Sequence, residues 1–164
     1  MKAAARVWHN QAILYDSEFF LDGNVKELER LAAQVRGFRS AHSLSEEVEF
    51  ELNLVLEELF VNAIRHGGCE GMERCARVRL GCEGERVAVE FSDRGEPFDP
   101  TQAPEADTES PLSERRAGGL GIHLVRSIMQ DVVYRRADDW NQVTMKRAGC
   151  GTAEIRPAGI EDFQ

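Results

Sequence analysis

Residues 57–68, EELFVNAIRHGG, carry polar side chains at a helical spacing that suits chemistry. Glu58, Asn62 and Arg65 stand at positions i, i+4 and i+7, so a helix would place all three on one face. The amide oxygen of Asn62 can ligate Mg²⁺, which takes its other ligands from water and substrate phosphates. The Glu58 carboxylate, one turn earlier, can act as a general base toward a hydroxyl nucleophile or a metal-bound water. A solvated polar helix face is the alternative, and it is a common pattern.

A second group follows a predicted strand, in FSDRGEPFDP (residues 91–100). Asp93 alternates with Val89 and Phe91, so the two-residue period of a strand places its carboxylate on their apolar face. A carboxylate there is poorly solvated unless a donor reaches it, and the exocyclic amine of adenine is a suitable donor. Gly95 lets the backbone pass close to a flat ring. An ordinary Asp-Arg-Gly turn is the alternative interpretation.

A third group is the run RRAGGLGIHLV (residues 115–125). Three glycines directly precede or open an apolar helix, where free backbone N–H groups can bind phosphate: Gly118, Gly119 and Gly121. The run is not a Walker A loop, because no GK[ST] follows, and it is not a Rossmann fingerprint after a first strand. Arg115 and Arg116 can meet phosphate charge or only solvate the loop. His123 lies inside the helix and is expected to be packed rather than catalytic.

Hydrophobic periodicity and turn residues predict the elements that position these groups. The first helix is expected to be capped by Asn24 and the second by Ser45 or Ser43, with Gly67 and Gly68 ending the second. The expected order is one or two short strands within 11–21, a helix from 24 to about 38, a helix from about 45 to 67, strands 75–82 and 86–92, a helix 119–130, and strands 131–136 and 140–147.

Residues 96–117 interrupt this pattern with four of the five prolines of the chain, among acidic residues and serines. An irregular loop of that length inside a compact domain is usually functional or disordered. The chain has no internal repeat and no linker that would divide it. We therefore expect one domain over residues 1–164, with a core at about 15–147 and a loosely ordered tail at 149–164.

The composition is that of a soluble globular domain, with 164 residues of which 42% are hydrophobic and 30% charged. A formal net charge of -9 disfavours non-specific binding to nucleic acid or an anionic membrane, so an anionic ligand needs a local positive site. No apolar stretch approaches a membrane span, and the N-terminus lacks the apolar core of a signal peptide, so we expect a cytoplasmic location.

The four cysteines, at positions 69, 75, 82 and 150, include no CxxC pair. In a cytoplasmic chain this spacing favours free thiols over a disulfide framework or a zinc site.

Together the three groups resemble the N, G1 and G2 boxes of the GHKL ATPase superfamily, which includes gyrase and histidine kinases. More closely, NAIRHG, DRGEPFDP and GGLGIHLVRSIMQDVVYRR resemble the anti-sigma-factor serine kinase family of bacteria. The resemblance covers about residues 15–147. It implies an α/β fold, a two-layer sandwich in which a mixed, mostly antiparallel sheet carries helices on one face.

The resemblance also implies a role for each motif residue. Glu58 would be the catalytic base, Asn62 the Mg²⁺ ligand, and residues 96–117 a lid over ATP. The nucleotide-binding residues implied are Asn62, Arg65, His66, Asp93, Gly95, Phe98, Arg115, Arg116, Gly118, Gly119, Leu120, Gly121 and Ile122. The Arg65 position is often apolar in relatives, and residues 1–14 and the tail lie outside the family's core.

The function implied is that of an ATP-binding anti-sigma factor that phosphorylates a serine of an anti-anti-sigma (STAS) protein. Its partners would be that protein and a sigma factor, without direct contact to nucleic acid or membrane, and a homodimer is allowed. One alternative is a nucleotide-gated binding module without kinase activity, which would need no base at Glu58. Another is a detached histidine-kinase catalytic domain, but no helical hairpin with a phosphoacceptor histidine precedes the motifs, and His42 is poorly placed for that role.

Overall fold

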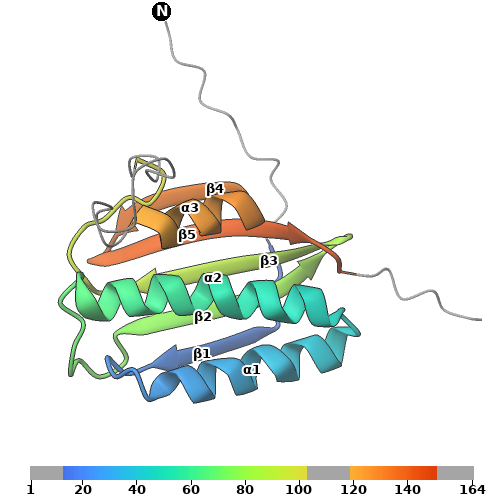
Figure 1. Cartoon of the computed structure of the whole chain (residues 1–164), viewed down its shortest axis with the longest axis horizontal. Coiled ribbons are helices and arrows are strands. Elements are labelled where there is room, and N and C mark those ends of the chain that lie inside the picture. The colour runs from blue at the N-terminus through green and yellow to red at the C-terminus, as the bar shows by residue number, and fades with distance from the viewer. Residues whose placement is uncertain (1–12, 103–118, 151–164) are drawn as a thin grey trace, which may run out of the picture.

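A computed structural model of the chain describes residues 13–102 and 119–150 (Figure 1). In chain order the elements are β1 (Ser17–Leu21), α1 (Glu27–His42), α2 (Glu46–Arg65), β2 (Ala76–Glu83), β3 (Arg86–Asp93), α3 (Gly119–Ile128), β4 (Gln130–Ala137) and β5 (Trp140–Ala148). Each predicted element is present, with ends shifted by a few residues.

The strands form one five-stranded sheet in the order β1-β2-β3-β5-β4, and every described pairing is antiparallel. Tight turns close the two hairpins. Gly84, between β2 and β3, has a φ of 58°, while Asp138 and Asp139, between β4 and β5, have φ values of 51° and 63°. Two successive positive φ values match the twist of a hairpin. All three helices cover one face of the sheet (Figure 1), which confirms the predicted two-layer α/β sandwich.

The central helix α2 follows its sequence signals closely. Ser45 caps it as expected, because its Oγ accepts a hydrogen bond from the Val48 N–H at 3.2 Å. Acidic residues occupy the first turn, where the helix dipole favours negative charge: Glu46, Glu47 and Glu49. The buried side chains of α2 all belong to the core: Val48, Leu52, Val55, Leu56, Leu59, Phe60, Ala63 and Ile64. Beyond the helix end, Gly68 takes a φ of 75°, which favours glycine.

The prediction that Asn24 caps the first helix is wrong. α1 begins at Glu27, behind Lys26, which makes no side-chain cap. Asn24 forms a turn instead: its Oδ1 accepts from the Lys26 N–H at 3.0 Å, and its carbonyl accepts from the Glu27 N–H at 2.9 Å. An Asn side chain readily bonds its own backbone two residues on, so Asn24 closes the turn that precedes α1 rather than capping the helix itself. At its other end α1 continues past Phe38 to His42.

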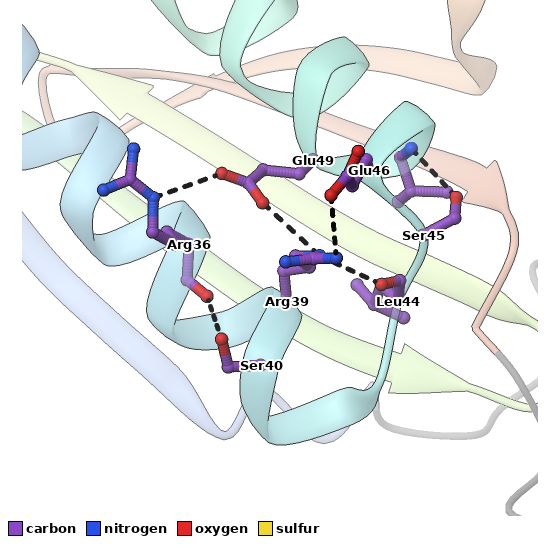
Figure 2. A network of polar contacts seen from close by, with 8 residues as sticks. Arg36, Arg39, Ser40, Leu44, Ser45, Glu46 and Glu49 are labelled. Carbon is purple, nitrogen blue, oxygen red and sulfur yellow. Dashed lines mark hydrogen bonds and ion pairs between the residues drawn. The ribbon is translucent and has the colours of Figure 1, made fainter.

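Polar contacts fasten α1 to the start of α2 (Figure 2). Arg39 Nε donates to the Leu44 carbonyl at 3.1 Å and lies 3.4 Å from Glu49 Oε2, while Arg36 Nε lies 3.5 Å from Glu49 Oε1. Each partly exposed pair contributes little alone, but several that share a carboxylate act as a network. This network orients α2, the helix that carries Glu58 and Asn62.

The prediction that all four cysteines are free thiols is wrong for one pair. Cys82 and Cys150 form a disulfide, whereas Cys69 and Cys75 are free and buried. The disulfide joins positions 68 residues apart. Both flank the same end of the sheet, because Val87 of β3 pairs with Cys82 on one side and with Arg147 on the other. Strand register, which sequence spacing does not show, brings them together.

Within the part of the chain that the structure describes, no helix is both long and apolar enough to cross a lipid bilayer.

Candidate functional site

A cavity of about 350 Å³ lies where β3 ends and β5 begins, below the last turns of α2 and beside α3. Its wall is mostly apolar, with a few polar groups, as is usual for small-molecule sites. The lining residues are Leu59, Asn62, Ala63, His66, Gly67, Phe91, Asp93, Glu96, Pro97, Phe98, Pro100, Ile122, Asn141 and Val143.

Asp93 is the most unusual polar group of this wall. Its Oδ1 accepts hydrogen bonds from the Gly95 N–H and from Asn141 Nδ2, both at 2.8 Å. Its Oδ2 accepts none from the residues that the structure describes. Burial raises the pKa of Asp93 above its ordinary value of 3.8, while these hydrogen bonds and the charge of Arg136 act in the opposite direction. A desolvated carboxylate on an apolar cavity therefore retains an unused acceptor oxygen.

Asn141 holds this carboxylate in place and is itself 3% exposed. Besides Asp93, its Nδ2 donates to the Glu96 carbonyl at 2.9 Å. Its Oδ1 accepts from Tyr134 OH and from Arg136 Nη1, both at 2.9 Å. Because its amide is bonded at both ends, its orientation is fixed, and with it that of Asp93.

Sequence reasoning missed Asn141. The sequence did contain a signal for it. Asn141 alternates with Val143 and Met145, so a strand places all three side chains on the same inward face of β5. A polar residue in register with a buried apolar row requires a partner inside the core.

Two glycines allow the loop after β3 to meet the end of α2. A Cβ built on Gly95 would lie 2.8 Å from Asp93 Oδ1 and 2.8 Å from the Gly67 carbonyl oxygen. A Cβ on Gly67 would lie 2.7 Å from the Ala63 carbonyl oxygen. The Glu96 N–H donates to the Gly67 carbonyl at 2.8 Å across this contact. Gly95 is therefore needed for close backbone packing, which also forms the edge of the cavity.

Glu58 and Asn62 meet as their spacing predicts. Asn62 Nδ2 donates to Glu58 Oε1 at 2.8 Å. Asn62 lines the cavity, and its Oδ1 accepts no hydrogen bond from the described residues. Glu58 does not line the cavity. Its carboxylate lies against Gly121 in the first turn of α3, so closely that a Cβ on that glycine would overlap it.

The start of α3 is where phosphate binding was expected. Gly119 and Gly121 lie in its first turn, and Ile122 is buried and lines the cavity. The structure describes the side chains of α3 only from residue 121 onward, so the Leu120 side chain lies outside the described part. Arg115, Arg116 and Gly118 also lie outside the described residues.

The remaining predicted site residues divide between the cavity and the surface. His66 lines the cavity, and Phe98, 51% exposed, contributes to its wall with two prolines. Arg65 is exposed and does not line the cavity. His123 is exposed, so the expectation that it is packed is wrong: it falls on the outer side of α3, away from Ile122 and Val125.

Only the first part of the predicted 96–117 lid is described, up to residue 102. Asp99 Oδ1 accepts from the backbone N–H and the hydroxyl of Thr101, at 2.8 and 2.7 Å. Arg126 of α3 donates to the Thr101 carbonyl at 2.8 Å. These contacts tie the segment to α3 beside the cavity.

Comparisons with known proteins show which family the chain belongs to. Residues 22–147 match the model of the histidine kinase-like ATPase domain family. The chain is 30% identical over 101 residues to serine/threonine-protein kinase BtrW of Bordetella bronchiseptica, covering 62% of this chain and 71% of BtrW. It is 26% identical over 86 residues to serine-protein kinase RsbW of Oceanobacillus iheyensis, covering 50% of this chain and 54% of RsbW.

A solved structure of the RsbU and RsbW domains of a Mycobacterium tuberculosis protein has a TM-score of 0.59 to this chain. The match has 13% sequence identity and covers 81% of this chain and 32% of the other, so it supports the fold alone. The family match, by contrast, includes α2 with Asn62, the end of β3 with Asp93, and the whole of α3. The chain therefore belongs to the histidine kinase-like ATPase domain family, within the GHKL superfamily that its three motifs resemble.

Proposed function

We propose that this protein binds ATP with Mg²⁺ in the cavity and transfers the γ-phosphoryl group to a serine or threonine of a partner protein. The observation that carries ATP binding is the partly buried Asp93 carboxylate, whose Oδ2 accepts no hydrogen bond from the described residues at an apolar cavity. The exocyclic amine of adenine is a donor that fits this oxygen. Phe91, Val143 and Ile122 would pack against the flat ring.

Asn62 fits the role of a Mg²⁺ ligand. Its Nδ2 is engaged by Glu58, which orients the unused Oδ1 as a hard oxygen donor on the cavity wall. Bound Mg²⁺ would neutralise charge on the phosphates. The N-terminus of α3 offers backbone N–H groups to the same phosphates, with glycine at Gly119 and Gly121.

Glu58 would accept the proton of the attacking hydroxyl. The hydrogen bond from Asn62 holds its carboxylate one helical turn from the proposed metal ligand. The names of BtrW and RsbW, both protein kinases, support phosphoryl transfer as the reaction. The acceptor we propose is a STAS-type anti-anti-sigma protein, and the second partner is a sigma factor that this protein would block in the cytoplasm.

A nucleotide-gated binding module is the second candidate function, and the position of Glu58 favours it. The Glu58 carboxylate does not line the cavity, accepts a hydrogen bond from Asn62 and lies against Gly121. In such a module, the nucleotide would move α3 and change a partner surface, and the carboxylate would only position Asn62.

Transfer of labelled phosphate from ATP to STAS proteins of the same genome distinguishes the two functions. For a kinase, Glu58→Gln preserves the shape and nearly all ATP affinity, while the transfer rate falls by about 10²–10⁴-fold, the usual contribution of a positioned base. Glu57→Gln is the matched control, because that side chain points about 100° away around the helix. Titration calorimetry with Mg·ATP measures affinity in the same samples.

Two results would reject parts of this account. ATP binding without transfer to any STAS candidate, or full transfer by Glu58→Gln, would reject the kinase and favour the binding module. Absence of ATP and ADP binding by the wild type would reject both.

A further inference from the structure

A second cluster of chemically capable side chains lies at the other end of the sheet from the cavity. Ligand atoms of His42, Cys82 and Cys150 all lie within 4.8 Å of one another. Cys82 pairs with Val87 near the start of β3, whereas Asp93 ends that strand. An inference drawn from this cluster is therefore independent of the proposed nucleotide site.

The histidine of the cluster is oriented by a carboxylate. His42 Nε2 lies 2.9 Å from Asp16 Oδ2, which leaves Nδ1 as the ring nitrogen available to a ligand. Asp16 is itself held at the edge of the sheet, since its N–H donates to the Leu80 carbonyl at 3.1 Å. Phe38 packs against the imidazole with 4.4 Å between ring centroids. Metal-binding histidines commonly have such a carboxylate on the second nitrogen, which fixes the tautomer and the ring orientation.

The two cysteines are held by backbone as well as by their disulfide. The Cys150 N–H donates to the Glu85 carbonyl at 3.0 Å, in the turn between β2 and β3, and Cys82 is in register within β2. Their Cα atoms are 6.0 Å apart. Cys150 is buried, and the His42 side chain is 24% exposed. The three residues would therefore stay close together if the sulfur–sulfur bond were broken.

We propose that the dithiol form of this protein binds a zinc ion through Cys82 Sγ, Cys150 Sγ and His42 Nδ1. Thiolate and imidazole are the ligands that zinc prefers, and a water molecule would complete a tetrahedron. With Zn–S bonds of about 2.3 Å, the two sulfurs need to separate to about 3.8 Å, which rotation of the two side chains provides. Asp16 in its present position orients His42.

Disulfide and metal exclude each other, because both use the same sulfur atoms. An external dithiol such as dithiothreitol breaks the Cys82–Cys150 bond, delivers two electrons and two protons to the sulfurs, and becomes a cyclic disulfide. Zinc then replaces the two thiol protons, which pass to the buffer. The site is thus formed only in reduced protein.

Cobalt(II) titration of the full chain tests this proposal, because thiolate-bound tetrahedral cobalt absorbs visibly and zinc displaces it. The protein is reduced with dithiothreitol, freed of reductant under argon, and titrated. We expect one cobalt per chain in wild type, and no thiolate–cobalt band in Cys82→Ser, Cys150→Ser or the unreduced protein. Asp16→Asn should weaken binding about tenfold or more, as loss of an orienting carboxylate typically does.

Matched controls separate this cluster from the other thiols and histidines. Cys69→Ala removes a buried thiol outside the cluster, and His123→Gln removes an exposed imidazole. Both should bind cobalt as wild type does, whereas His42→Gln should bind at least tenfold more weakly. Far-ultraviolet circular dichroism shows whether each variant is folded. Absence of the band in reduced, folded wild type, or an unchanged band in folded Cys82→Ser or His42→Gln, would overturn the proposal.

Discussion

Asn141 of β5 and Asp93 of β3 are direct partners across the sheet, and the amide of the first donates to Oδ1 of the second at 2.8 Å. One oxygen of a partly buried carboxylate is thereby bonded within the protein, while the other is left for a ligand. This relationship makes Asn141 a positioning residue for the proposed adenine contact.

Asn141→Ala should destabilise the protein and weaken nucleotide binding together. The change removes one of the two donors to Asp93 Oδ1 and the side-chain donor to the Glu96 carbonyl, and an unsatisfied buried polar group costs about 1–3 kcal/mol. Urea unfolding and calorimetry with Mg·ADP measure the two effects. Gln142→Ala is the control, since Gln142 lies on the opposite face of β5 and bonds Arg135. Unchanged ADP affinity in Asn141→Ala would show that Asp93 needs no such support.

Asp93→Asn should lose nucleotide affinity without losing stability. An Asn Oδ1 can still accept from Gly95 and Asn141, but its NH₂ group would stand where Oδ2 was, as a donor facing the adenine amine. The expected loss is about 1–3 kcal/mol of binding free energy. Calorimetry with ADP and with GDP checks it, and equal ADP affinity in variant and wild type would remove adenine from the assigned position.

The free energy of unfolding of ligand-free protein should depend on pH through Asp93. Because burial raises its pKa above 3.8 in the folded state, the folded protein holds this proton at a pH where the unfolded chain has released it. The contribution of Asp93 to stability therefore falls as pH rises from about 4 through the folded pKa. Urea unfolding of wild type and Asp93→Asn across this window should show the wild type losing stability relative to the variant. A constant difference would contradict the raised pKa.

Gly121→Ala should disrupt the contact between α3 and α2. The added methyl would overlap the Glu58 carboxylate, so either Glu58 leaves Asn62 or the start of α3 moves. We expect weaker Mg·ATP binding and, for a kinase, slower transfer. Gly37→Ala is the control: no atom lies within 4 Å of its added Cβ, and alanine in an exposed helix should stabilise by about 0.5–1 kcal/mol. Wild-type binding and transfer rates in Gly121→Ala would show that the contact is not needed.

Reduction of the Cys82–Cys150 disulfide should lower the free energy of unfolding by about 2–4 kcal/mol, because a long closed loop regains freedom in the unfolded chain. Urea unfolding with and without dithiothreitol measures the change in metal-free buffer. A Cys82→Ala, Cys150→Ala double variant should not respond to the reductant. If wild type and double variant respond equally, the disulfide is not the cause.

The sequence predicted well the positions of those candidate site residues that depend on one element alone. Glu58 and Asn62 meet because helical geometry brings positions four apart together, and Asp93 faces the core because strands alternate. Ser45 caps α2 for an equally local reason.

Contacts between distant segments could not be predicted in this way. Asn141, the cluster of His42 with two cysteines, and the packing of Glu58 against Gly121 depend on strand register and helix docking. Arg65 fits the polar line of α2, but its side chain is exposed and does not line the cavity. Hydrophobic periodicity predicts on which face of a helix or strand a side chain lies, but not how far that side chain is from residues of other elements.

The strand order has a consequence for how the molecule is made during synthesis. β1, β2 and β3 pair among themselves early in the sequence, but β5, which forms a hairpin with β4, can pair with β3 only after most of the chain has been produced. Such non-local pairing is slow compared with local hairpins. Asn141 and Val143 of β5 complete the cavity, so the cavity exists only once this last pairing has formed. A ligand that binds this cavity therefore stabilises only those molecules in which β5 has paired with β3. It thereby lowers the population of incompletely folded chains that can aggregate.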